Sequence, residues 1–130
     1  MNPQSEQGLG YHSILVVDDD RAVRESLKFS LVIEGFAVRA YADAEQVLAE
    51  PRFPRFDCLI VDQNMPGMNG LDLVSALRAR HIETPAILIT SHPNQSVRDR
   101  AASAGIPIIE KPLLNSLLDH VRRTVSHEGS

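Results

Sequence analysis

The sequence has one cysteine, no tryptophan and no long hydrophobic segment. The single cysteine, Cys58, excludes an internal disulfide and a cysteine-rich zinc site, and it fits a reducing compartment. The hydrophobic runs, such as Ile14–Val17 and Ala86–Ile89, are far too short to span a lipid bilayer. The polar N-terminus lacks the hydrophobic region of a signal peptide. These absences predict a cytoplasmic protein without a membrane anchor.

The balance of charge excludes a further class of function. Thirteen Lys and Arg residues against seventeen Asp and Glu residues give a net charge of -4, so the chain lacks the positive field that binding to nucleic acid requires. Its 130 residues suffice for one domain, and 43% of them are hydrophobic. We expect one globular domain over residues 13–125, an N-terminal tail over 1–12 and a C-terminal tail over 126–130, with no direct contact to nucleic acid.

Short hydrophobic runs and amphipathic segments alternate along the chain, and this alternation predicts five strands and five helices. The expected strands are Ile14–Val17, Phe36–Tyr41, Cys58–Val61, Ala86–Ile89 and Ile106–Glu110, and the expected helices centre on 23–31, 43–48, 71–77, 97–104 and 114–125. Parallel neighbours need crossover helices, and right-handed crossovers restrict the strand order. The pattern therefore predicts an α/β fold, a flavodoxin-like three-layer α/β/α sandwich whose five-stranded parallel sheet has the order 2-1-3-4-5.

Two details concern the last strand and the helix before it. Pro107 falls inside the fifth expected strand, and because proline cannot donate a ladder hydrogen bond, we expect that strand at the edge of the sheet. The helix expected at 97–104 has only a weak hydrophobic stripe. We therefore expect this helix to be loosely anchored.

Charged and reactive side chains gather where the expected strands end. Asp18 and Asp19 follow the first strand, Asp62 follows the third, Thr90 the fourth and Lys111 the fifth. Ligands of open α/β sheets bind outside these ends, where the strand order switches. Two carboxylates about 4 Å apart repel each other by about 4 kcal/mol at an effective dielectric constant of about 20, so the group requires cations. Lys111 supplies one positive charge, and we expect Mg²⁺ to supply the rest.

The same residues suit a phosphoryl group on Asp62. An aspartyl phosphate is a known form of nucleophilic carboxylate chemistry, and the metal ion, Lys111 and Thr90 would bind its oxygens. Single residues also have simpler interpretations: Asp20 is expected to be only a helix N-cap, and Thr90 alone would suit a strand end. Lys111, however, is one of only two lysines among thirteen basic residues, which favours a specific role. No phosphate-binding loop, dinucleotide-binding fingerprint or EF-hand spacing is present.

These motifs resemble the receiver domain of bacterial two-component response regulators, and the resemblance covers residues 13–125. It is carried by Ile14–Asp20 and Leu59–Gly70, then by Thr90 and by Glu110-Lys111-Pro112. The resemblance implies that the chain acts in two-component signal transduction. Asp62 would accept a phosphoryl group from a sensor histidine kinase or a histidine phosphotransfer protein.

The resemblance also implies a role for each site residue. The implied metal ligands are Asp19, Asp62 and the Asn64 carbonyl, with Asp18 acting through water. Thr90 and Lys111 would hold the phosphoryl oxygens, and the Lys111-Pro112 bond would be cis. Such a protein promotes its own phosphorylation and dephosphorylation, so no turnover of an external substrate is expected.

The sequence departs from the family's usual pattern at several positions. Ile108 stands three residues before the lysine, where the family usually has an aromatic residue that couples to the hydroxyl residue on activation. The chain therefore has no aromatic side chain at the position through which the family's switch usually acts. Leu113 replaces a frequent phenylalanine, and Ser91 replaces a small apolar residue. Asn64 and His92 occupy positions that resemble the family's tuning sites for the lifetime of the phosphoryl group.

Three hypotheses about function follow. The leading one is a stand-alone receiver whose phosphorylation switches the binding of a downstream protein partner through the face of the fourth helix, fifth strand and fifth helix; a phosphorylation-dependent homodimer remains open. The alternative is the receiver part of a longer DNA-binding transcriptional regulator, with its output domain after Ser130. A less favoured one is an aspartate-nucleophile phosphatase of the haloacid dehalogenase-like type, whose motif D-x-D-x-[TV] is matched at Asp18 and Asp20 but not at Ala22.

Overall fold

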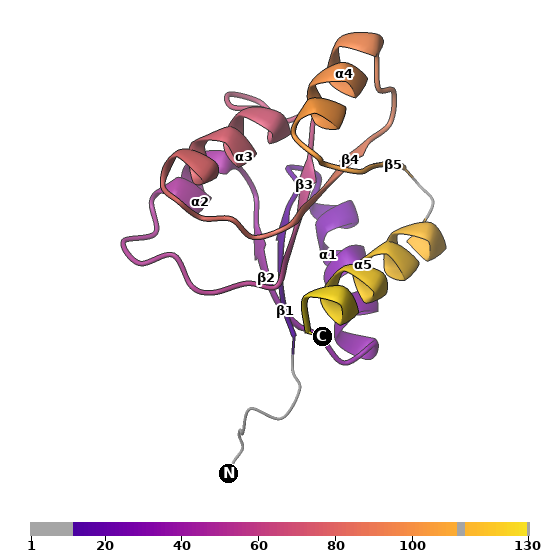
Figure 1. Cartoon of the computed structure of the whole chain (residues 1–130). Coiled ribbons are helices and arrows are strands. Elements are labelled where there is room, and N and C mark those ends of the chain that lie inside the picture. Colours follow the sequence, from indigo (N-terminus) through magenta and orange to yellow (C-terminus); the bar gives the residue numbers. More distant parts are fainter. Residues whose placement is uncertain (1–11, 112–113, 130) are drawn as a thin grey trace.

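Five parallel strands form one sheet whose order in space is β2-β1-β3-β4-β5. Figure 1 shows the computed structural model, which describes residues 12–111 and 114–129. The elements in chain order are β1 (Ser13–Val17), α1 (Arg21–Ile33), β2 (Ala37–Tyr41), α2 (Ala44–Leu48), β3 (Cys58–Asp62), α3 (Gly70–Ala79), β4 (Ala86–Thr90), α4 (Gln95–Ser103), β5 (Ile108–Glu110) and α5 (Leu114–Gly129). The predicted flavodoxin-like order is confirmed, and β5 lies at the edge.

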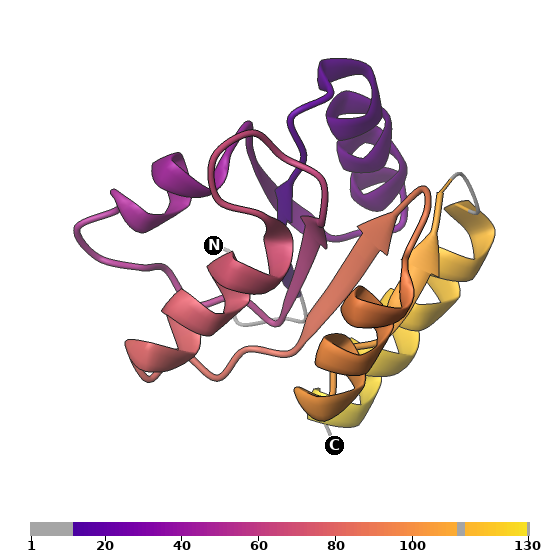
Figure 2. The same ribbon diagram turned by 90° about the horizontal axis from the view of Figure 1, so that it is seen from above.

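Helices cover both faces of the sheet (Figure 1, Figure 2), with α1 and α5 on one face and α2, α3 and α4 on the other. Successive residues of β1 serve the two cores in turn. Leu15 and Val17 pack on the side of α2 and α3, whereas Ile14 and Val16 pack on the side of α1 and α5. Burial on both faces explains why the strand sequences are continuous hydrophobic runs. No helix in the described part of the chain is long and apolar enough to cross a membrane.

A side-chain oxygen caps the start of each of the first four helices. The capping residues are Asp20, Asp43, Asn69 and Asn94, and each accepts a hydrogen bond from a backbone N–H of the first turn. The prediction for Asp20 is confirmed, because its Oδ1 accepts from the N–H groups of Ala22 and Val23 at 2.9 and 3.2 Å. Asp20 therefore starts α1, whereas Asp18 directly follows β1.

Three helices end in the same way. After α1, α3 and α4, one residue adopts a left-handed backbone conformation: Gly35 at φ 100°, His81 at φ 65° and Gly105 at φ 71°. The next N–H then returns to a carbonyl five residues earlier, as that of Ile82 does to Leu77 at 3.0 Å. Glycine adopts this conformation without strain, whereas the Cβ atom of His81 makes it costly.

Two strands begin later than expected. The N–H of Phe36 still bonds to the carbonyl of Leu31 in α1, at 3.1 Å, so β2 begins one residue further on. β5 begins at Ile108, which places Pro107 before the strand rather than inside it. The carbonyl of Pro107 nevertheless accepts from the N–H of Leu88 at 2.9 Å, since proline lacks only the donor.

Both ends of the domain reach slightly beyond the expected boundaries. The carbonyl of His12, the last residue of the expected N-terminal tail, accepts from the N–H of Ala37 at 2.9 Å. The rest of that tail, residues 1–11, lies outside the described residues. α5 continues to Gly129, past the expected end at the buried Val125.

The expectation of a loosely anchored α4 agrees with its contacts. Ala101 is the one buried residue of this helix. Its exposed side chains form ion pairs, from Arg100 to Asp72 at 2.8 Å and from Arg98 to Glu110 at 3.2 Å. Exposed ion pairs contribute only about 0–1 kcal/mol each. Few strong interactions would therefore have to break for α4 to move.

Replacing His81 by glycine is expected to stabilise the fold by about 1 kcal/mol, because glycine avoids the steric penalty of a left-handed residue with a Cβ atom. The free energy of unfolding in urea measures this change. Gly105→Ala, at the corresponding position after α4, is the matched control and is expected to destabilise the protein. A His81→Gly protein less stable than the native one would contradict the prediction.

Candidate functional site

The parallel strands carry the chemically active residues to one edge of the sheet. Asp18 directly follows β1, Asp62 and Thr90 are the last residues of β3 and β4, and Lys111 directly follows β5. β1, β3, β4 and β5 are successive neighbours in the sheet, so their C-terminal ends lie side by side. This edge includes the point between β1 and β3 where the strand order switches, which is where ligands bind in such folds.

Three carboxylates form the centre of the site. One oxygen each from Asp18, Asp19 and Asp62 lies within 4.8 Å of the other two. Asp18 is fully buried and Asp62 is only 2% exposed, whereas Asp19 faces solvent. Asp20 is engaged as the N-cap of α1 and does not belong to this group.

Lys111 provides the positive charge. Its Nζ lies 3.0 Å from Asp18 Oδ2 and 3.4 Å from Asp62 Oδ1. Burial acts to lower the pKa of Lys111, but the two carboxylates outweigh this effect and hold the pKa above its ordinary value. The ammonium group is therefore charged at neutral pH and binds both buried acids.

Asp62 is harder to ionise than an ordinary aspartate. Burial, and after it the charge of Asp18, raises the pKa of Asp62 from 3.8 to about 6. Lys111 and the N–H of Asn64, at 3.2 Å from Asp62 Oδ1, act in the opposite direction without cancelling the rise. The site without a metal ion therefore holds more negative charge than its one ammonium group compensates.

The oxygen atoms of this site fit a divalent cation such as Mg²⁺. Asp18 Oδ1 accepts from the N–H of Asp20 at 2.9 Å, but no hydrogen bond of suitable geometry from the described residues reaches the buried Oδ2, although Lys111 is close. A hydrated divalent cation would satisfy this atom through one of its bound waters, and its two charges would balance the remaining acids. The residues present thus suit the metal ion expected from the sequence.

Asn64 links the two halves of the site. Its Nδ2 donates a hydrogen bond to Thr90 Oγ1 at 3.0 Å, and its backbone N–H donates to Asp62 Oδ1. Thr90 is only 1% exposed whereas Asn64 is exposed, so this contact lies between the protein interior and the surface. Sequence patterns place Asn64 near Asp62 but do not show that its side chain reaches Thr90.

Two residues that the sequence patterns did not single out position the end of β3. Gln63 Oε1 accepts from the N–H of Leu71 at 2.9 Å, and the Gln63 carbonyl accepts from the N–H of Gly70 at 3.2 Å. A Cβ atom at Gly70 would lie 2.6 Å from the carbonyl oxygen of Asp62, closer than packing allows. Only glycine lets α3 begin so near to β3. The available signal was a glycine directly after an asparagine N-cap.

Arg24 supports the other side of the site. It lies in the second turn of α1, and its Nη1 donates to the backbone carbonyl of Asp18 at 2.8 Å. This bond fixes the chain where it turns from β1 toward α1. Nothing in the sequence distinguishes Arg24 from the other arginines.

Two features expected from the sequence concern residues outside the described part of the chain. These are the cis Lys111-Pro112 bond and the substitution at Leu113. The apolar residue at Ile108 is described, and it is half-buried in β5, opposite Leu88.

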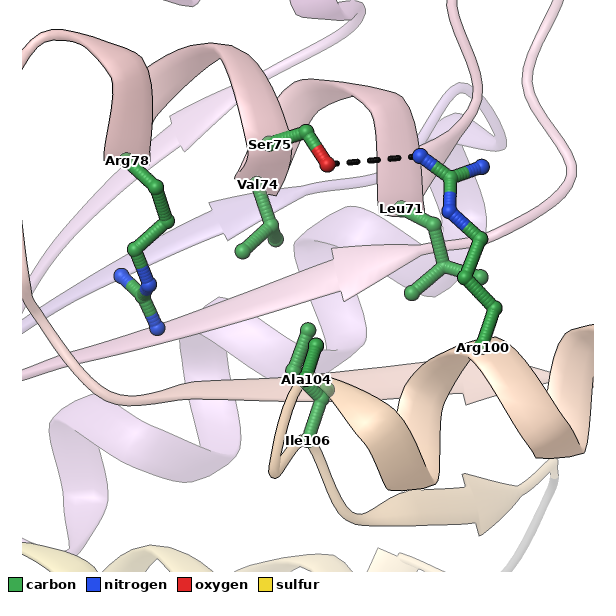
Figure 3. A pocket seen from close by; sticks show the side chains of 7 residues that line it. All are labelled: Leu71, Val74, Ser75, Arg78, Arg100, Ala104 and Ile106. Carbon is green, nitrogen blue, oxygen red and sulfur yellow. Dashed lines mark hydrogen bonds between the residues drawn. The ribbon is translucent and has the colours of Figure 1, made fainter.

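A second depression lies between α3 and α4 and shares no residue with the acidic site (Figure 3). Its volume is about 180 Å³, and Leu71, Val74 and Ile106 provide its apolar lining. Arg100 reaches across from α4 to Ser75 of α3 at 3.3 Å. This groove contains no acidic side chain, so the metal chemistry belongs to the sheet edge.

Comparison with known proteins agrees with the geometry at the sheet edge. The family model of the response regulator receiver domain matches residues 14–122. This chain belongs to that family. The receiver domain is a signalling module of two-component systems, and receiver domains generally bind Mg²⁺ in an acidic pocket and interact with histidine kinases and phosphodonors.

Curated relatives include full-length bacterial regulators. The chain is 35% identical over 118 residues to the transcriptional regulatory protein FixJ of Rhizobium meliloti (strain 1021), and the match covers 89% of this chain and 58% of FixJ. It is 38% identical over 111 residues to the response regulator MprA of Mycobacterium avium (strain 104), covering 84% of this chain and 49% of MprA. The chain thus spans about half the length of the curated relatives it matches.

Solved structures show the same fold at the scale of a single receiver domain. A CheY-like receiver domain protein from Methanospirillum hungatei JF-1 has a TM-score of 0.85 and 26% identity, covering 92% of this chain and 98% of that one. The structure titled FixJ-N has a TM-score of 0.80 and 33% identity, with coverage of 92% and 96%. The receiver of the family therefore corresponds to nearly the whole of this chain.

Gly70→Ala is expected to destabilise the protein by about 2 kcal/mol, because the added methyl group would press against the Asp62 carbonyl and the Leu88 side chain. Urea unfolding measures the change. Gly105→Ala adds the same methyl group where no atom lies within 4 Å, so it reports backbone strain alone. Equal losses for the two variants would refute the close contact at Gly70.

The pH dependence of stability in EDTA is expected to reveal Asp62. Its pKa is raised in the folded state, so the folded protein binds the proton more tightly than the unfolded chain does. The contribution of this group is therefore present at low pH and is lost as pH rises from about 4 to about 6. The native protein should lose on the order of 2 kcal/mol relative to Asp62→Asn across this window, measured by urea unfolding. A constant difference between the two proteins would contradict this.

Proposed function

We propose that this chain receives a phosphoryl group on Asp62 from a phosphohistidine donor and switches the binding of a partner in response. The observation that carries the proposal is the buried Asp62 carboxylate with Lys111 Nζ 3.4 Å away and the carboxylates of Asp18 and Asp19 beside it. An isolated buried carboxylate would destabilise the folded state, because it loses its hydration without gaining a partner. An acid within reach of a cation and a metal-binding pair instead suits a reaction with a charged phosphoryl group.

In the proposed step, one oxygen of Asp62 forms a bond to phosphorus while the P–N bond of the donor breaks. The electron pair of that bond remains on the imidazole nitrogen of the donor histidine. Lys111 and Thr90 would then hold phosphoryl oxygens through charge-assisted and neutral hydrogen bonds. Mg²⁺, when bound by Asp19, Asp62 and the Asn64 carbonyl with Asp18 acting through water, would neutralise charge on the transferred group.

The proposed response involves the face formed by α4, β5 and α5. Lys111 follows β5 directly, and its N–H donates to the Thr90 carbonyl at 3.0 Å, so one peptide bond and one backbone hydrogen bond connect the site to the edge strand. α4 is attached by the buried Ala101, by the partly buried Val97 and by exposed ion pairs, so few strong contacts oppose its displacement. A downstream protein, or a second copy of the chain, would bind the rearranged face.

One alternative has specific support. The matched regulators FixJ and MprA are about twice as long as the aligned segment, and the name of FixJ describes a transcriptional regulatory protein. The alternative proposal is that the chain is the receiver part of a longer DNA-binding regulator. In that case the partner of the α4-β5-α5 face is an output domain. By contrast, a phosphatase of the D-x-D type needs its second acid in the site, and Asp20 is instead the N-cap of α1.

A cytoplasmic location and the absence of an external substrate belong to the same proposal. The one thiol, Cys58, is buried and unpaired, as is usual in reducing compartments. A phosphodonor would be consumed only in modifying the protein itself.

Labelling with acetyl phosphate tests the proposed function. The native protein should gain one phosphoryl group in the presence of Mg²⁺, detected by intact mass, and the gain should disappear in EDTA and in Asp62→Asn. Asp20→Asn is the matched control, since asparagine also caps helices and Asp20 is outside the acid group. Continued labelling of Asp62→Asn, or no labelling of the native protein under rapid quenching, would reject the proposal.

A further inference from the structure

The contact between Asn64 and Thr90 has a defined direction. Asn64 Nδ2 is the donor and Thr90 Oγ1 is the acceptor, at 3.0 Å. An amide nitrogen has no lone pair to accept a hydrogen bond, so the hydroxyl hydrogen of Thr90 must point away from Asn64. In the described part of the chain, no other group accepts that hydrogen. A hydroxyl that is 1% exposed therefore retains an unused donor.

The backbone leaves Thr90 little freedom except rotation of its side chain. The Thr90 carbonyl accepts from the N–H of Lys111 at 3.0 Å, and the preceding carbonyl, of Ile89, accepts from the N–H of Gln63 at 2.9 Å. β4 is thus held by β3 on one side and by the chain after β5 on the other. The direction of the hydroxyl hydrogen is then decided by side-chain partners.

Within β5, which the structure describes in full, no side chain competes for the hydroxyl. Ile108 is apolar and pairs with Leu88 in the strand register, while Glu110 pairs with Thr90 but turns its carboxylate to Arg98 at 3.2 Å. Asn64 comes from the opposite direction, after β3, where its backbone N–H also binds Asp62 Oδ1. Control of the Thr90 hydroxyl therefore comes from the residue that also contacts the Asp62 carboxylate.

We propose that Asn64 is a positioning residue whose carboxamide holds the Thr90 hydroxyl ready to donate a hydrogen bond to a phosphoryl group on Asp62. This inference rests on the proposed function and assigns the Asn64 side chain a task separate from that of its backbone carbonyl. A donor oriented in advance costs no reorganisation when the phosphoryl group arrives. A hydroxyl that already accepts a hydrogen bond is also a better donor, because such bonds strengthen one another.

Binding of beryllofluoride, a tetrahedral mimic of a phosphoryl group that does not hydrolyse, tests the proposal without interference from phosphoryl lifetime. The affinity is measured by 19F NMR with Mg²⁺ and excess fluoride. Asn64→Ala keeps the backbone carbonyl and is expected to weaken binding about fivefold, the factor that corresponds to one net hydrogen bond of about 1 kcal/mol. Unfolding temperatures of all variants confirm that the fold is retained.

A double-mutant cycle tests whether Asn64 acts through Thr90. In Thr90→Val, which lacks the hydroxyl, adding Asn64→Ala should change the affinity by less than about twofold. In Thr90→Ser, which keeps a hydroxyl, the full effect should return. Asn64→Asp reverses the polarity, since a carboxylate accepts the Thr90 hydrogen, and it should weaken binding more in the native background than in Thr90→Val.

The outcomes separate this proposal from the proposed function. A native protein that does not bind beryllofluoride would refute the receiver chemistry itself. If the native protein binds it but Asn64→Ala binds equally well, Asn64 has no positioning role. Tighter binding by Asn64→Ala would mean that Asn64 withdraws the hydroxyl from the site, and an undiminished effect in Thr90→Val would mean that it acts elsewhere. Each of these last three results would overturn the inference.

Discussion

The mutual repulsion of the buried Asp18 and Asp62 carboxylates, held against one ammonium group, is the interaction on which the rest of the site depends. Removing a charged group from water favours its neutral form, and a neighbouring like charge adds to the effect. The raised pKa of Asp62 is the measure of both. The fold sustains this arrangement because each acid stands at the end of a central strand that is buried on both faces. The same excess of negative charge favours the binding of a divalent cation at the site.

The surroundings of the site differ sharply in how firmly they are held. On the side of α3, Gln63 and Gly70 join the helix to the end of β3 through backbone contacts that leave no space for a Cβ atom. On the side of α4, the buried Ala101, the partly buried Val97 and exposed ion pairs provide the attachment. In the proposed function, a charge added at Asp62 would meet a firmly held support on the side of α3 and a weakly attached helix on the side of α4. Such a difference is what a local event needs in order to change a more distant surface.

Much of the fold was predictable from local patterns because those patterns have direct physical causes. Strands covered on both faces need continuous hydrophobic runs, so β1 and β3 were identified with their terminal acids. Asp20 was identified as a cap because a short acceptor side chain before a helix has one common use. Pro107 is predicted to lie inside the fifth strand, but β5 begins at Ile108. The missing N–H of proline shows that the strand is at an edge, and it does not show at which residue the strand begins. The start of β2 was misplaced at Phe36 because the return bond to α1 is not visible as hydrophobic periodicity.

The sequence alone determined the order of elements and the identity of the side chains at the strand ends. In a parallel sheet, those ends meet at one edge whatever the details of packing, so an acid group with a lysine and a hydroxyl followed from the order of residues. Only the tertiary structure decided the individual contacts of the site, because these contacts depend on distances of a few tenths of an ångström. It placed the Asn64 amide on Thr90 Oγ1, excluded a Cβ atom at Gly70 and left Asp18 Oδ2 without a hydrogen bond. These contacts join residues that are close only after the sheet has formed, and periodicity within one segment carries no information about them.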